Sequence, residues 1–221
     1  MMKRFFITIS IVSAFLTGCQ DETYIPFVEL GAVEDEVVIP AEGNSVEIQV
    51  YANGAYKAEF LNDVAWASLD SDKGSSDGIL KLTCTANDGF RRSAALVLKS
   101  DIDIRTDTVL VKQEGLIEEI LQMENTSIVL DAQGGEHSEL INTNIPSDQI
   151  TISVTYPTAD RWIEACTISE GAERKLLITA KANDNTISRM ATITISYIDA
   201  WGESLSLELT LEQKASDSTT N

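Results

Sequence analysis

Short runs in which apolar and polar residues alternate follow one another along most of the chain. Val46, Ile48 and Val50, for example, are separated by Glu47 and Gln49. A period of two indicates a β-strand with one buried face, and nothing in the first half has the period of an α-helix. The pattern therefore predicts an all-β protein. Similar runs lie at 56–60, 79–86, 94–98, 109–113, 150–156, 176–180 and 209–213.

Turn-forming residues divide these runs into short strands. Asn53-Gly54 and Asn87-Asp88-Gly89 are turns of this kind, and the Asp, Ser and Gly content of residues 70–78 predicts a loop. Before them, residues 24–30 predict a first strand with Pro26 near its edge. Short strands with closely spaced turns are typical of β-sandwiches.

The second half of the chain repeats the first. Residues 86–98 return as residues 182–195, with Asn87 matched by Asn183. A repeat of this length predicts two tandem β-sandwiches, each large enough to bury its own core. The other matched pairs are Trp66 with Trp162 and Gln113 with Gln213.

The repeat sets the domain boundaries. We place the sandwiches at residues 25–115 and 116–215, and we expect the polar tail at 216–221 to be disordered. Residues 116–121 are compatible with a helix. They occupy the repeat position of residues 27–30, so we interpret them as a linker and the first strand of the second sandwich.

The start of the chain predicts a signal peptide at residues 1–18. The basic Lys3 and Arg4 precede an apolar run that is too short to span a bilayer. Leu16-Thr17-Gly18-Cys19 resembles the lipobox of bacterial lipoproteins, which implies cleavage before Cys19 and diacylation of its thiol. Several acyl chains on one residue give a stable anchor. Residues 19–24 would then form a lipidated tether.

The three residues that follow Cys19 indicate the cellular location of the protein. Gln20, Asp21 and Glu22 resemble the signal that exports lipoproteins of some Gram-negative anaerobes to the outer face of the outer membrane. The resemblance implies an outer-membrane protein exposed at the cell surface. The alternative is a few solvated charges in a tether.

The net charge of the chain limits the classes of partner that it can bind. It carries 35 acidic and 16 basic residues, which gives a formal net charge of −19. Such a surface is repelled by nucleic-acid phosphates and by anionic lipid heads. We therefore expect no nucleic-acid partner, and instead neutral or cationic ones.

The residue types needed for catalysis are sparse. Cys84 and Cys166 fit neither a disulfide framework nor a metal cluster, and we expect both to be buried thiols. His137 follows a glycine turn without a nucleophile pattern nearby, so we expect an exposed turn histidine. With so many acidic residues, a catalytic pair of carboxylates for glycoside hydrolysis stays an open alternative. However, two domains of this size offer no deep cleft for such a pair. We predict that the protein is not an enzyme and has no cofactor.

One loop has the composition of a weak calcium site. Asp70, Asp72 and Asp77 surround Gly74, which suits a sharp turn. Lys73 and the lack of a bidentate glutamate argue against bound Ca²⁺. The alternative is a polar loop between strands.

Sugar binding needs an exposed aromatic ring beside hydrogen-bonding groups. Trp201 is the best candidate because it lies at a predicted hairpin tip, and Tyr197 and Tyr156 are the others. The alternative for Trp201 is a loop packed on its own or the neighbouring domain. Trp66 and Trp162 are repeated, so we assign them to the two cores.

The two copies share a set of motifs in the same order. These are Glu42-Gly43-Asn44, Trp66, Gly74, Asn87, 92–96 and 109–115 in copy one, and Gly134-Gly135, Trp162, Asn183, 189–193 and 211–213 in copy two. Together they resemble the BACON domain, a small immunoglobulin-like sandwich, closely over nearly all of copy one and more loosely in copy two, where Lys214-Ala215 replaces the usual glycine after the glutamine. The resemblance implies two tandem immunoglobulin-like β-sandwiches. The family often occurs on surface lipoproteins and beside glycoside hydrolases, and the resemblance also implies the carbohydrate or mucin binding proposed for it.

Two functions follow as hypotheses. The first is a surface lipoprotein whose tandem domains bind carbohydrate or host glycans. The second is a structural spacer or accessory subunit that contacts other proteins of the cell envelope. An exposed aromatic site favours the first, whereas a fixed protein partner favours the second.

Overall fold

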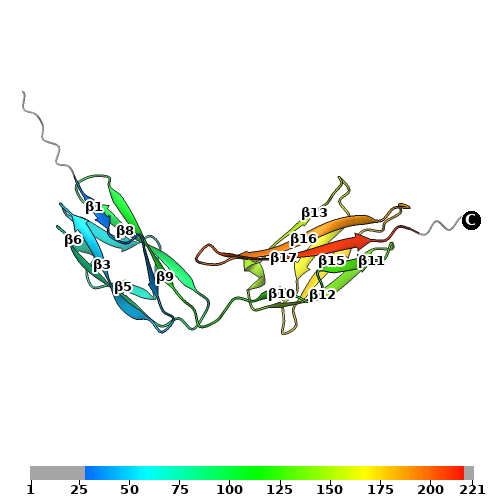
Figure 1. The fold of residues 1–221 in the computed structure, drawn as a ribbon, viewed down its shortest axis with the longest axis horizontal. Helices are drawn as coiled ribbons and strands as arrows, with labels where there is room; N and C mark the ends of the chain where they lie inside the picture. The colour runs from blue at the N-terminus through cyan, green and yellow to red at the C-terminus, as the bar shows by residue number, and fades with distance from the viewer. Residues whose placement is uncertain (1–27, 217–221) are drawn as a thin grey trace, which may run out of the picture.

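The computed structural model describes residues 28–216, which form two β-sandwiches placed end to end (Figure 1). The prediction of an all-β protein built from two tandem immunoglobulin-like sandwiches is confirmed. Within these residues the only helical element is a short 3₁₀ turn, Ser147–Gln149. The first sandwich contains β1 to β9 and the second contains β10 to β17.

The first sandwich consists of a four-stranded and a five-stranded sheet. The four-stranded sheet is antiparallel, and in the other sheet β2 runs parallel to β9. The four-stranded sheet has the order β1 (Leu30–Ala32), β3 (Asn44–Ala52), β7 (Gly78–Cys84) and β5 (Ala67–Leu69). The five-stranded sheet has the order β2 (Glu36–Ile39), β9 (Thr106–Gln113), β8 (Arg92–Ser100), β4 (Tyr56–Phe60) and β6 (Lys73–Gly74).

The second sandwich repeats this topology with two four-stranded sheets. Here β11 runs parallel to β17, as β2 does to β9. One sheet has the order β10 (Leu121–Met123), β12 (Gly135–Thr143), β15 (Lys175–Ala180) and β14 (Ile163–Ile168). The other has the order β11 (Ser127–Leu130), β17 (Ser204–Gln213), β16 (Arg189–Ile198) and β13 (Thr151–Thr155).

Three expectations are wrong in detail. The first strand in the described residues is Leu30–Ala32, so Val28 and Glu29 of the strand expected at 24–30 lie before it, and residues 24–27 are not described. Residues 70–78 are not all loop, because Lys73–Gly74 pairs with β4. His137 lies within strand β12 and not in a turn. In contrast, residues 116–120 have no regular structure and β10 begins at Leu121, as the linker interpretation predicts.

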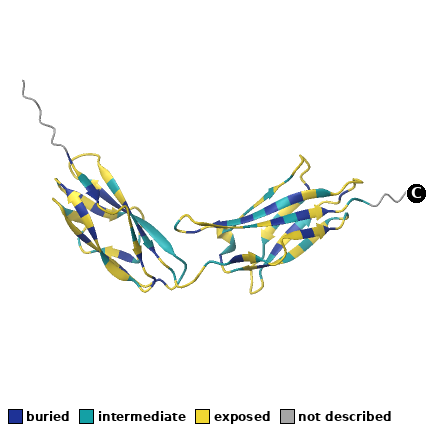
Figure 2. Cartoon of the chain, in the orientation of Figure 1, coloured by how far each residue is buried: buried dark blue, intermediate teal, exposed yellow. Residues whose placement is uncertain are grey.

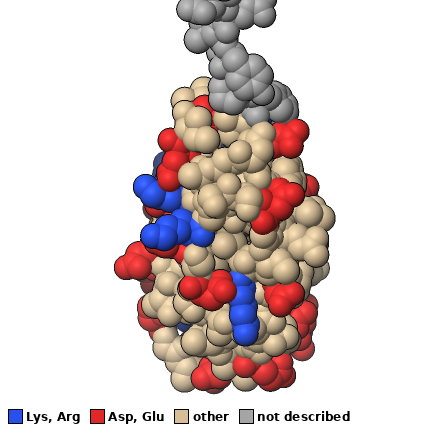
Figure 3. Space-filling view, turned by 90° about the vertical axis from the view of Figure 1, so that its left-hand side faces the viewer, with Lys and Arg blue, Asp and Glu red and all other residues tan. Residues whose placement is uncertain are grey.

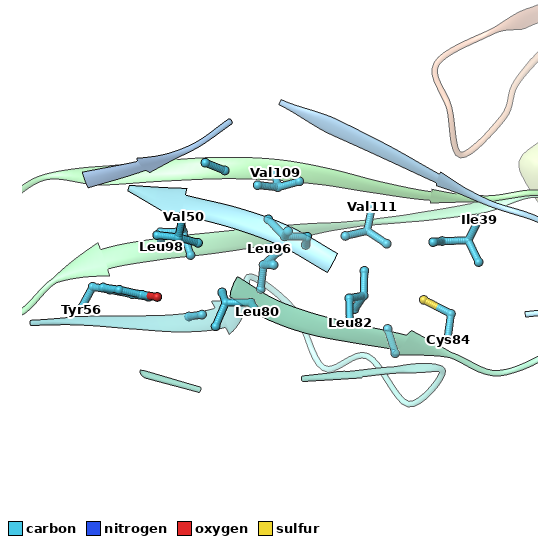
Figure 4. Close-up of a cluster of buried hydrophobic side chains, with 14 of the residues drawn as sticks. Ile39, Val50, Tyr56, Leu80, Leu82, Cys84, Leu96, Leu98, Val109 and Val111 are labelled. Atoms are coloured by element: carbon cyan, nitrogen blue, oxygen red, sulfur yellow. The ribbon is translucent and has the colours of Figure 1, made fainter. Parts of the chain in front are cut away.

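Each sandwich has its own apolar core, formed where the inward residues of the two sheets meet (Figure 2). In the first sandwich Leu82, Leu96 and Val111 are completely buried, and their side chains lie between the two sheets (Figure 4). Full burial of one such side chain contributes about 1.5–3 kcal/mol to folding. In the second core, Trp162 is among the largest fully buried side chains.

A buried polar network closes one end of the first sandwich. Every second residue of the closing strand β9 faces the core. After Val109 and Val111, the next such residue is Gln113, which is fully buried. Gln113 Oε1 accepts a hydrogen bond from Arg92 Nε at 2.9 Å, and its Nε2 donates to the carbonyl oxygens of Pro40 and Thr85. A buried amide needs such partners.

Two further residues complete this network. The Arg92 guanidinium lies 4.5 Å from the centre of the Trp66 ring, a cation–π contact that also shields the charge. The side-chain amide of buried Asn87 donates to the carbonyl oxygens of Phe90 and Glu114, which shapes the turn before β8. We call Trp66, Asn87, Arg92 and Gln113 the end network.

The second sandwich contains the same end network. Gln213 Oε1 accepts from Arg189 Nε at 2.9 Å, and Arg189 lies 5.1 Å from the centre of the Trp162 ring. Asn183 Nδ2 donates to the carbonyl oxygens of Ile187 and Lys214. The repeated tryptophan, asparagine, arginine and glutamine are therefore structural, because they join the two sheets of each sandwich.

We predict that Gln113→Ala destabilises the first sandwich by about 2–4 kcal/mol, because it leaves Arg92 Nε and two carbonyl oxygens without their buried partner. The midpoint of urea unfolding measures the change. Gln49→Ala is the matched control, since Gln49 is exposed on β3 and should change the stability by less than about 0.5 kcal/mol. Equal effects of the two substitutions would contradict the role of the end network.

Candidate functional site

The hairpin β16–β17 of the second sandwich extends toward the first (Figure 1). Its tip is Asp199 to Gly202, and Gly202 has a φ of 82°, which only glycine adopts easily. Asp199 Oδ1 accepts hydrogen bonds from the backbone N–H groups of Trp201 and Glu203. These bonds hold the tip in one shape, with the tryptophan facing the neighbouring domain.

The tip is held on the first sandwich by polar contacts. Arg91, just before β8, forms ion pairs with buried Asp199 and with Glu203. The Ser93 hydroxyl donates to the carbonyl oxygen of Ala200. Because these partners come from both sandwiches, the hairpin fixes one domain against the other.

Trp201 is the centre of this contact. Its indole N–H donates to the carbonyl oxygen of Arg92 at 3.1 Å. The Arg91 guanidinium lies 5.1 Å from the centre of its ring and the Lys112 amine lies 5.4 Å away, within cation–π range. The side chain is half-buried. Trp201 therefore packs on the neighbouring domain and keeps only part of its side chain accessible.

The linker between the sandwiches is held at both ends. The backbone N–H of Leu116 donates to the carbonyl oxygen of Asn87, and that of Ile117 donates to Gly89. A side chain at Gly115 would place a Cβ 2.3 Å from the Gly89 carbonyl oxygen, so only glycine fits. At the far end, Asn144 accepts from the Ile120 N–H and donates to the Glu118 carbonyl oxygen.

A cavity of about 390 Å³ lies between this linker and the hairpin. We call it the junction cavity. Its walls combine aromatic, aliphatic and charged side chains from the first sandwich, the linker and the second sandwich. They are Arg91, Glu114, Gly115, Leu116, Ile117, Glu118, Glu119, Tyr197, Asp199, Trp201 and Leu205.

Burial and charge shift two titratable groups at this cavity. Burial raises the pKa of Tyr197, and the negative charges of Glu119 and Asp199 raise it further, so the phenol stays protonated and able to donate. For Arg91, burial lowers the pKa, but the hydrogen bond to Glu203 and the charge of Asp199 outweigh it, and the pKa is raised overall. The junction cavity therefore presents a fixed cation and a neutral phenol.

The structure brings two of the three predicted aromatic residues together. Trp201 and Tyr197 both line the junction cavity, although Tyr197 is buried and not exposed as we expected. Tyr156 lies elsewhere, in a cavity of about 360 Å³ between β13 and β14, where Arg161 lies 4.6 Å from its ring centre. Its ring also meets Trp162 edge-on, with centres 6.3 Å apart.

The three carboxylates of the suggested calcium loop are not brought together as a cation site. Asp70 Oδ1 accepts from the Lys81 N–H, and Asp77 Oδ1 accepts from the Ala52 N–H, so both tie the loop to neighbouring strands. In residues 28–216 no group of three or more histidine, cysteine or acidic side chains is placed to hold a metal ion. Residues 70–77 are better explained by the alternative, a polar connection between strands.

The cysteines and the histidine have identifiable surroundings. Cys84 is buried, and Cys166 is partly buried with its pKa raised by burial to about 11, which disfavours the reactive thiolate. His137 Nε2 lies 2.9 Å from Glu139 Oε1, and Asn125 also donates to that carboxylate. The hydrogen bond from Asn125 and the contact with His137 lower the pKa of Glu139.

Two residues of the junction cavity escaped the sequence analysis. Arg91 precedes the repeated arginine of the end network, and the second copy has Ser188 at that position. Glu119 lies in the linker among other acids. The difference between the two copies at this position could have identified Arg91 as a candidate site residue. No local sequence feature distinguishes Glu119 from the other linker acids.

Several predictions lie outside the described residues. These are the signal peptide at 1–18, the lipidation of Cys19, the export signal at Gln20, Asp21 and Glu22, and most of the tail. Within the described part of the chain, no helix is long and apolar enough to cross a membrane.

Several solved structures have a low similarity to this chain. A Bacteroides ovatus GH5 xyloglucanase in complex with a XXXG heptasaccharide is 17% identical over 49% of this chain, with a TM-score of 0.37, and the match spans 22% of that enzyme. A chimeric titin Z1Z2-Z1Z2 tandem is 13% identical over 85% of this chain and 100% of its own, with a TM-score of 0.36. Human mucin-like protocadherin EC1-2 is 11% identical over 85% and 98%, with a TM-score of 0.34.

The family comparison is more specific. Residues 56–114 match the family described as "BACON: Putative binding domain, N-terminal". No curated protein matches the chain. The match runs from the start of β4 to the residue after β9, and so includes the asparagine, arginine and glutamine of the first end network. Over residues 56–114, the first sandwich therefore matches the BACON family that its motifs resemble.

Proposed function

We propose that this protein is a non-catalytic surface lipoprotein whose tandem sandwiches bind carbohydrate. The observation that carries the proposal is the convergence of Trp201 and Tyr197 at the junction cavity, beside Arg91 and Asp199. Ligand sites typically combine an apolar or aromatic wall with a few fixed polar groups. The description of the matched family as a binding domain supports the same function.

The chemistry of the cavity walls suits a sugar. A sugar ring presents C–H groups on its faces and hydroxyl groups at its edge. Trp201, Leu116 and Leu205 offer apolar contact for the faces. Tyr197, with its raised pKa, keeps its hydroxyl proton for donation, and carboxylates accept from sugar hydroxyls.

The overall charge favours a neutral ligand. Asp and Glu side chains are spread over the face of the first sandwich in Figure 3, with few Lys and Arg side chains among them. With a formal net charge of −19, the chain repels acidic polymers at long range. Neutral glycans meet no such barrier.

The lipid anchor supplies the location in this proposal. Cys19 would carry the acyl chains, and Gln20, Asp21 and Glu22 would direct the protein to the outer face of the outer membrane. The tether at residues 19–24 would then separate the sandwiches from the membrane. The two domains would present their junction to extracellular glycans.

A second function is favoured by a specific observation. The linker is hydrogen-bonded at both ends, and the hairpin fixes one sandwich against the other. A joint of this kind suits a spacer that holds a partner of an envelope assembly at a set distance. Binding to protein without binding to glycans would favour this alternative.

We predict that residues 20–221, which retain every described residue, bind neutral glycans on a glycan array and release no sugar from them. Trp201→Ala should weaken binding more than about tenfold, because it removes the central aromatic contact. Tyr156→Ala is the matched control at the separate cavity and should bind like the unsubstituted protein. Small-angle scattering of Trp201→Ala reports whether the joint has also opened.

Three outcomes of the array differ in meaning. Loss of binding in Tyr156→Ala alone would move the site to the cavity between β13 and β14. Absence of binding to every glycan, together with recovery of a fixed envelope protein, would replace the proposal by the spacer function. Release of reducing sugar would contradict the non-catalytic assignment.

We predict separately that Cys19→Ala releases the protein from membranes. Each buried methylene contributes about 0.8 kcal/mol, so removing the lipidated thiol removes most of the membrane affinity. Fractionation of cells into soluble and membrane pools measures the change, with Cys166→Ala as the control cysteine. Unchanged membrane association of Cys19→Ala would contradict the anchor, and protease treatment of intact cells tests exposure at the surface.

A further inference from the structure

The junction cavity is built by both sandwiches, whereas the cavity between β13 and β14 is lined by the second sandwich alone. Arg91 comes from the first domain, residues 114–119 from the linker, and Tyr197, Asp199, Trp201 and Leu205 from the second. The three aliphatic residues of its wall are exposed and are not packed in either hydrophobic core. They are Leu116, Ile117 and Leu205. Neither sandwich alone contains the complete set of groups.

Unpaired polar atoms gather at this cavity. In residues 28–216, three side-chain nitrogen or oxygen atoms are shielded from solvent without a hydrogen-bond partner, namely Arg91 Nε, Glu119 Oε1 and Trp162 Nε1. The first two belong to residues that line the junction cavity. Such atoms are rare in folded proteins because a buried polar group without a partner is unfavourable. One is a donor and the other an acceptor.

The charges around these atoms limit what pairs with them. Glu114, Glu118, Glu119 and Asp199 contribute carboxylates to the walls, whereas Arg91 is the single cation among the lining residues. Arg91 already forms ion pairs with Asp199 and Glu203. An anionic ligand would therefore meet net negative charge, and a purely apolar ligand would leave both atoms without partners. A neutral molecule with several hydroxyl groups meets neither difficulty.

We infer that the junction cavity is the carbohydrate site and that it takes an uncharged sugar ring. One hydroxyl oxygen accepts from Arg91 Nε and another hydroxyl donates to Glu119 Oε1, while Trp201 contacts a face of the ring. Both atoms are shielded from solvent in this conformation, so the ligand engages them only after the side chains of the cavity wall rearrange. This inference rests on the proposed function and gives it a place and a ligand class.

The site has a mechanical consequence. A ligand that contacts Arg91 of the first sandwich, Glu119 of the linker and Trp201 of the second sandwich spans the joint. Binding then favours the closed joint over any opened one, because only the closed joint assembles all three groups. The tandem arrangement is therefore part of the site and not only a means of reach.

The test uses residues 20–221 with a panel of neutral hexoses and N-acetylhexosamines, and with glucuronic and sialic acids as acidic probes. Titration is followed by the nuclear magnetic resonance signal of the Trp201 indole N–H and by calorimetry. We expect neutral sugars to shift that signal and acidic sugars to bind at least about tenfold more weakly. Glu119→Ala should lower the affinity by about tenfold or more, since it removes a hydrogen bond to a charged group.

Glu208→Ala is the matched control. It removes the same charge from an exposed residue of β17 that does not line the junction cavity, and it should change the affinity less than about twofold. Arg91→Lys keeps a cation for Asp199 but removes the Nε donor, and should weaken binding as Glu119→Ala does. Urea unfolding midpoints close to the unsubstituted value establish that these variants are folded.

The possible failures are distinguishable. Sugar binding that is unchanged in both Glu119→Ala and Arg91→Lys, or that leaves the Trp201 signal unshifted, would overturn the junction site while leaving carbohydrate binding intact. Equal affinity for neutral and acidic sugars would overturn the ligand class. If neither the panel nor the glycan array detects binding, the proposed function itself fails.

Discussion

The buried hydrogen bond between Arg92 and Gln113 is the constraint on which the first sandwich and its joint depend. A glutamine at a core position of the closing strand requires partners, and they come from the guanidinium and from carbonyl oxygens of both sheets. The same end of the sandwich holds the Asn87 turn, whose carbonyl oxygen accepts from the linker at Leu116. The end network therefore also sets the direction in which the chain leaves the domain.

The two copies share this network and differ where they meet. Arg91, which holds the hairpin tip, is replaced by Ser188 in the second copy, and the tip with Trp201 has no counterpart in the first. Asp199 is buried and acidic, so it needs the cation that Arg91 provides. A few local differences between the copies thus create one specific interface between them.

Alternation along the strands was sufficient to predict the sandwiches, because inward positions such as Leu80 and Leu82 are both apolar and spaced by two. Alternation did not predict the strand position of His137. His137 of β12 pairs with the core residue Ile178 of β15, as Val46 of β3 pairs with Leu82 of β7. A polar residue at an inward position interrupts the apolar pattern and therefore suggests a turn. The contact of His137 with Glu139, which the sequence does not show, explains how it is accommodated in the strand. The site was harder still, because no local pattern records which surface a hairpin tip will contact.

A tryptophan at a hairpin tip has two physical explanations, a joint or a ligand platform, and the contacts of Trp201 give reasons for both. Its indole N–H and its cationic neighbours belong to the joint. A joint selected only for rigidity would pair every buried polar atom, since each unpaired one lowers its stability. Arg91 Nε and Glu119 Oε1 break that rule within the walls of a single cavity. Local departures of this kind concentrate at functional sites, and here the departure lies where two domains and an aromatic ring converge.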